Sequence, residues 1–149
     1  MTGFLFELTF FLAAPVWLLM IFAPHWRGTE RLAASPLTVL PILAVWAVLA
    51  APVLPELWAA VSSPGLDAFR DLTALANGAG ALWAQVIAWD LLLGQWMYRE
   101  ARRLSVPPLL MAPLLLLTIL LSPVGLPLFL IVRAIWTTRS ERRPVRAPA

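Results

Sequence analysis

One carboxylate stands alone inside a long apolar stretch of the sequence. Asp90 is the only charged residue between positions 72 and 98. To insert a carboxylate near the middle of a membrane helix costs about 2.5–3.5 kcal/mol of free energy on insertion scales. Such residues usually face other helices. A carboxyl group can donate or accept a proton in catalysis. Asp90 is therefore a candidate catalytic residue, and the alternative is a structural pair with Arg27, Arg31 or a helix end.

Small and polar residues accompany Asp90 along the same stretch. Gln85 and Gln95 lie five residues to either side of it, about 140° around a helix, so neither shares its face closely. Gly94 follows four residues later, shares the face of Asp90, and would let a neighbouring helix or a ligand approach. We expect a narrow polar notch along the face of Asp90 and Gly94. Gln85 and Gly94 are candidates to line a ligand site, although membrane glutamines more often join helices.

The eight tryptophans of the chain fall into two groups. Those near segment ends fit the aromatic belts of membrane interfaces: Trp26, Trp58, Trp96 and Trp136. The deeper group contains Trp46, Trp83 and Trp89. Trp89 and Trp96 are seven residues apart and lie on one face of a helix. They are candidates to line an apolar slot for a polyene, with core packing or lipid contact as the alternative.

Several kinds of chemistry are excluded by the residues that are missing. The chain has no cysteine, which removes disulfides and thiolate chemistry. All eleven basic residues are arginine, which removes Schiff-base lysines and the phosphate-binding lysine of P-loops. The single histidine, His25, cannot form a metal site by itself. The arginines are spread among apolar segments, so we expect neither a bound metal nor a nucleic-acid partner.

Composition places the chain in a lipid bilayer. Of its 149 residues 61% are hydrophobic and 13% charged, whereas soluble domains carry about 25% charged residues. Charge-poor runs occupy residues 8–24, 32–55, 72–89 and 104–132, and about 20 apolar residues span a bilayer as a helix. We expect an all-α membrane protein with one transmembrane domain over residues 1–138 and a basic, disordered tail over 139–149.

The first and third runs have features that decide their roles. Glu7 precedes the first run where a signal peptide would carry basic residues, so we expect an uncleaved helix. Before the third run, Leu66, Phe69 and Leu72 recur at helical spacing opposite charged residues. This pattern predicts a short amphipathic helix at the membrane interface. Asn77 and Gly78 should end it, or a bend at Gly78 and Gly80 should join it to the third run.

The fourth run is too long for one straight crossing. Its 29 uncharged residues would extend about 43 Å as a helix, against a hydrocarbon core of about 30 Å. Two prolines and a glycine at positions 123–127 favour a turn. We therefore expect three crossings and then either a strongly kinked fourth crossing or a helical hairpin.

The distribution of arginines favours the hairpin. If the fourth run folds back, ten of the eleven arginines lie on one side of the membrane with Arg70 alone on the other. A single crossing divides them five against six. Cytoplasmic loops are enriched in arginine and lysine. We expect a multi-pass protein of a bacterial inner membrane, with its N-terminus outside and its C-terminal tail in the cytoplasm.

Three stretches resemble the abscisic-acid-deficient-four-like family. Residues 14–19 and 22–27, APVWLL and FAPHWR, look like the opening of that family. Residues 83–96, WAQVIAWDLLLGQW, are similar to its W-x-H-x-x-A-F-D-L-F-x-G-R-W stretch, and residues 117–126 to its L-T-x-x-x-G-P-x-G-L segment. The chain departs from the family by Gln85 for histidine, Trp89 for phenylalanine, Gln95 for arginine and Ser122 for glycine. A mechanism that needs an imidazole at position 85 could not run unchanged.

Two functions are consistent with this resemblance, because the plant members are required to form the epoxy-carotenoid neoxanthin. The first is a cofactor-free isomerase, or an accessory factor for it, that acts on a carotenoid through Asp90. The second is a structural or pigment-binding subunit of a larger membrane complex, in which Asp90 holds the helices together. The resemblance implies a carotenoid or other pigment as ligand, and membrane proteins or a second copy of the chain as partners.

Overall fold

The computed structural model describes residues 1–141, and every regular element within that range is helical. These residues form two compact units. The first unit contains residues 1–16 and 36–92, and the second contains residues 17–35 together with the chain from Leu93 onward. Helices α1 (Thr2–Phe22) and α6 (Ala76–Arg103) each contribute to both units. Of the tail expected at residues 139–149, residues 139–141 belong to the last helix, and residues 142–149 lie outside the described residues.

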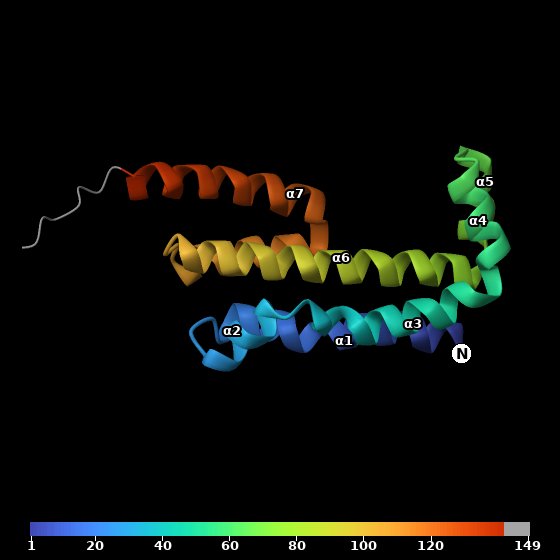
Figure 1. Cartoon of the computed structure of the whole chain (residues 1–149), viewed down its shortest axis with the longest axis horizontal. Coiled ribbons are helices and arrows are strands. Elements are labelled where there is room, and N and C mark those ends of the chain that lie inside the picture. The colour runs from blue at the N-terminus through green and yellow to red at the C-terminus, as the bar shows by residue number, and fades with distance from the viewer. Residues whose placement is uncertain (142–149) are drawn as a thin grey trace, which may run out of the picture. The chain divides into compact units, whose positions relative to one another are not determined.

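In the first unit, the apolar stretch over residues 36–62 is divided into several short helices, of which Figure 1 labels α3 (Leu40–Ala50) and α4 (Leu54–Ser62). Pro41, Pro52 and Pro55 each lie in the first turn of one of these helices. Proline fixes φ and therefore favours the start of a new helix. Small residues allow close packing: a Cβ on Gly80 would lie 3.3 Å from a methyl group of Leu49. The stretch consists of η1 (Pro36–Val39), α3 (Leu40–Ala50), η2 (Ala51–Val53) and α4 (Leu54–Ser62).

The amphipathic helix expected before the third run is present as α5 (Leu66–Ala74). It ends earlier than predicted, at an extended Leu75, and α6 begins at Ala76. Asn77 and Gly78 are therefore in the first turn of α6, and the prediction that they end the preceding helix is wrong. Gly78 is required for packing, because a Cβ there would overlap the backbone carbonyl of Leu72.

The second unit joins α2 (Arg27–Ala34) and the last turns of α1 and α6 to α7 (Pro108–Glu141). Its core contains Trp17, Met20, Met97, Leu115 and Phe129, all at most 4% exposed. Helix α6 ends in a Schellman motif, in which the Val106 amide donates to the Ala101 carbonyl at 2.9 Å. Ser105, at φ 55°, is the only non-glycine residue with positive φ in the described chain.

Helix α7 reverses direction at Leu121, whose backbone is non-helical (φ −149°, ψ 72°). Thr118 and Met111 on its first arm lie beside Met97 and Ala101 of α6, so this arm runs antiparallel to α6. Phe129 and Arg133 on its second arm meet Trp96 and Glu100, so that arm runs parallel to α6. The two arms consequently form a helical hairpin, which Figure 1 shows as the ribbon turning back on itself.

Prolines explain why the reversal falls where it does. Pro123 lies in the first turn of the second arm, where the backbone N–H groups of a helix have no internal partner, and Pro127 lies one turn further on. The break lies one residue before the turn expected at Ser122–Pro127. Gly125 lets the arms approach, because a Cβ on it would overlap Thr118. The fourth run was expected to be a strongly kinked crossing or a hairpin, and in the structure it folds as a hairpin.

Three helical stretches are long and apolar enough to cross a membrane: Thr2–Phe22, Pro36–Ser62 and Pro108–Arg139. They correspond to the first, second and fourth runs of the sequence. Helix α6 has sufficient length at 28 residues but is not among these three stretches, and its crossing stays a prediction. The chain is thus an all-α, multi-pass membrane protein with three helical stretches capable of spanning.

Candidate functional site

Asp90 lies in the middle of α6, which carries most of the predicted site residues. It is half-buried and interacts with its surroundings, so it is not a free carboxylate. Ala88 and Leu91, next to it along the helix, are at most 1% exposed, and Trp89 between them is 65% exposed. Asp90 therefore stands at the boundary between the buried and the open side of α6.

Gly94 lies one turn after Asp90 and is buried. The space beside its Cα is occupied by the indole ring of Trp17, which is 4% exposed. The predicted close approach at this glycine is therefore made by a tryptophan of α1. Any Cβ at position 94 would overlap this ring.

The open side of α6 carries the candidate ligand-lining residues. Gln85, Trp89, Leu92 and Trp96 follow one another at intervals of four, three and four residues, which places them on one line along the helix. Gln85 is half-buried, Trp89 is 65% exposed, and Trp96 is 41% exposed while its ring contacts Phe129 edge-on at 5.4 Å. Trp89 belongs to the first unit and Trp96 to the second, and each is exposed within its unit.

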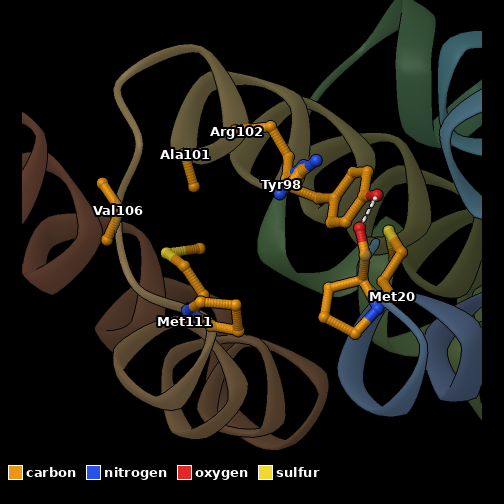
Figure 2. A pocket seen from close by; sticks show the side chains of 8 residues that line it. Met20, Tyr98, Ala101, Arg102, Val106 and Met111 are labelled. Atoms are coloured by element: carbon orange, nitrogen blue, oxygen red, sulfur yellow. Dashed lines mark hydrogen bonds between the residues drawn. The ribbon is translucent and has the colours of Figure 1, made fainter. Parts of the chain in front are cut away.

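Tyr98 forms a polar contact in the second unit that the sequence did not single out. Its hydroxyl donates to the Pro24 carbonyl at 2.6 Å, although the side chain is only 3% exposed. Figure 2 shows this bond beside a pocket lined by Met20, Ala101, Val106 and Met111, among others. The open space there is about 10 Å³, which is about the room that one water needs. The pocket therefore does not fit a polyene.

Two glutamates of the second unit form ion pairs with three of its arginines. Glu30 on α2 accepts from Arg102 at 3.0 Å. Glu100 is 11% exposed and accepts from Arg103 and Arg133, each at 2.7 Å, which joins α6 to the second arm of α7. The hydrogen bonds from Arg103, and then those from Arg133, hold the pKa of Glu100 below its usual value. These pairs fix the ends of three helices of this unit.

A groove of about 450 Å³ lies in the first unit where α6 begins. Apolar lining comes from Val53 and Leu75, and polar lining from Thr2, Glu56 and Asn77. The Thr2 hydroxyl lies 2.7 Å from Oδ1 of Asn77 and donates to it. The volume is within the range of small-molecule sites, about 300–1,000 Å³, but the groove is open to its surroundings.

The structure therefore distributes the polar groups over several places. Asp90, Gln85, Trp89, Gly94 and Trp96 share α6, while Tyr98, Glu100 and Arg102 lie at its far end. Within residues 1–141, no three histidine or acidic side chains lie close enough to hold a metal ion, and His25 is exposed. A sequence signal for Glu100 was available, since it is the one acid among Arg99, Arg102 and Arg103.

Long apolar helices and a helical hairpin define a small multi-pass membrane protein. The profile of the ABA DEFICIENT 4-like family matches residues 4–129. The chain belongs to that family, as its sequence motifs indicated, and this membership implies a link to carotenoid metabolism. No curated protein and no solved structure matched the chain in the other two comparisons.

Proposed function

We propose that the protein acts in carotenoid metabolism by binding a polyene against the open face of α6. Trp89 and Trp96 supply aromatic surface on this face, and family membership over residues 4–129 supplies the class of ligand. The exposure of Trp89, at 65%, is the observation that carries the proposal. A large aromatic side chain open on a membrane helix can pack against an extended apolar ligand as well as against lipid.

Asp90 is the group assigned to handle a proton in this proposal. It lies one residue from Trp89, at the edge of the open face. A carboxyl group there can protonate or deprotonate a polyene bound along α6. The reaction would be an isomerisation without a cofactor. Gln85, one turn from Trp89, is positioned to donate a hydrogen bond to a polar group of the ligand.

The second candidate is a pigment-binding or structural subunit of a membrane complex. The observation in its favour is that Asp90 already interacts within the chain. Interacting carboxylates in membrane helices can serve to hold helices together. In that case the polyene, or a partner helix, covers Trp89 and Trp96 and undergoes no change.

Expression in carotenoid-producing cells distinguishes the two candidates. Pigments that copurify with the protein and those converted in the cells are both analysed, for the parent chain, Asp90→Asn and Asp71→Asn. Asp71 is the matched control because it is an exposed aspartate on α5. Conversion that Asp90→Asn alone abolishes, at equal protein level, supports the enzyme. Bound but unchanged pigment, insensitive to both substitutions, supports the subunit. If the protein neither binds nor converts any pigment, the link to carotenoids is contradicted.

A further inference from the structure

The two units carry opposite net charge. The first unit contains Arg70 as its one arginine against five acidic residues. The described part of the second unit contains seven arginines against three glutamates. Basic side chains are therefore concentrated on the unit formed by α2, α7 and the ends of α1 and α6.

Internal ion pairs use only part of this positive charge. Glu30 binds Arg102, and Glu100 binds Arg103 and Arg133. Arg27 and Arg31, one turn apart on α2, and Arg99 on α6 are exposed and form no ion pair within the described residues. The Glu30–Arg102 pair, at 3.0 Å, joins the two helices that carry these three arginines. We call Arg27, Arg31 and Arg99 the open arginines.

Exposed apolar side chains lie close in sequence to Arg27 and Arg31. Phe22 at the end of α1 is 76% exposed, Trp26 immediately before α2 is 58% exposed, and Leu32 on α2 is 39% exposed. On α2 itself, Thr29 and Ala33 are buried while Arg27 and Arg31 point outward. A short amphipathic helix with tryptophan and arginine at its edge is typical of the headgroup region of a bilayer.

We propose that the open arginines bind the phosphate of an anionic phospholipid headgroup. A guanidinium group presents paired N–H donors that match phosphate oxygens, and the chain uses arginine alone, without lysine, for all its basic residues. The exposed Phe22, Trp26 and Leu32 identify the source of the phosphate, because they would contact the acyl chains of the same lipid. A soluble anion or a nucleic acid would leave these three side chains in water.

Lipid titration of the purified full-length protein in neutral detergent tests the proposal. Phosphatidylglycerol, phosphatidylcholine and inorganic phosphate are added separately, and bound lipid is counted by native mass spectrometry alongside the thermal midpoint. The variants are Arg31→Gln, the triple variant of the open arginines to glutamine, and Arg70→Gln. Arg70 is the matched control because it is an exposed arginine on α5 in the other unit.

We expect phosphatidylglycerol to bind more tightly than phosphatidylcholine, with the preference falling as salt rises. Each open arginine removed should weaken this binding about fivefold, and Arg70→Gln should leave it unchanged. Three outcomes would overturn the proposal. The two lipids could bind equally, Arg70→Gln could weaken lipid binding as much as the open-arginine variants do, or inorganic phosphate could stabilise the protein while phosphatidylglycerol does not. If the triple variant does not fold, the comparison of Arg31→Gln with Arg70→Gln still decides the outcome.

Discussion

The indole ring of Trp17 fills the space beside the backbone of Gly94. Both residues belong to the second unit and both are buried. This contact brings α1 and α6 close together at Gly94. Asp90 lies four residues before Gly94 along α6. Its dependence on a missing Cβ makes it directly testable.

Gly94→Ala should destabilise the protein by about 1–3 kcal/mol, because the added methyl group forces the Trp17 ring out of its position. Thermal unfolding in detergent, followed by tryptophan fluorescence, measures the effect. Gly3→Ala is the control, since a Cβ at that position of α1 meets no atom within 4 Å. An unchanged midpoint for Gly94→Ala would mean that Trp17 does not pack there.

Acid should weaken the attachment of the second arm of α7 to α6. The pKa of Glu100 is lowered in the folded protein by Arg103 and Arg133. Its ion pairs therefore stabilise the fold fully above the ordinary carboxyl pKa of about 4.3, and this contribution is lost as pH falls through the lowered value. The thermal midpoint should fall by a few degrees over that range.

Glu100→Gln should remove this part of the pH dependence and lower the midpoint by a similar amount at neutral pH. Glu56→Gln serves as the comparison, because Glu56 is exposed and forms no ion pair within the described chain. Equal pH profiles for the parent chain and Glu100→Gln would contradict the assigned role of Glu100.

Ser105→Gly should stabilise the end of α6. Ser105 has a φ of 55°, a conformation in which a side chain is strained and glycine is not. Relief of this strain should raise stability by up to about 1 kcal/mol. Ser122→Gly provides a contrast, because Ser122 has no positive φ and glycine near the start of a helical arm costs stability. A lower midpoint for Ser105→Gly would contradict the expectation.

Orientation in the membrane is a prediction of the arginine distribution. A reporter fused to the C-terminus should be active in the cytoplasm, and one fused to the N-terminus should be active outside. This result would support three crossings followed by a hairpin that returns to the side of the membrane from which it entered. Reporters that place both termini on one side would contradict the arrangement.

The sequence predicted elements better than it predicted their junctions. Uninterrupted apolar runs identify α1, the stretch from Pro36 to Ser62 and α7, because burial of apolar surface determines them. The end of α5 was predicted two to three residues too late, because Gly78 was interpreted as a helix stop. Its actual role is contact with the Leu72 carbonyl, which depends on how the chain folds back and is not visible in a local pattern.

The same distinction applies to the candidate site. Helical periodicity was sufficient to place Trp89 and Trp96 on one face of α6 and Asp90 beside it. It could not identify Tyr98 or Glu100, whose partners Pro24 and Arg133 are 74 and 33 residues away. Such pairings depend on tertiary packing. The cluster of arginines around Glu100 is visible in the sequence, but it does not indicate the distant partner Arg133.

The reversal at Leu121 also bears on how the protein is made. In a single crossing, every arginine from Arg133 onward would have to be moved through the bilayer as the chain is synthesised, and each arginine at the centre of a membrane costs about 2.5–3.5 kcal/mol. Because the second arm returns alongside α6, Arg133 and Arg139 end near the side from which α7 started. In the proposed orientation, the segment that enters the membrane after Arg103 then carries no charged residue, since residues 104–132 are all uncharged.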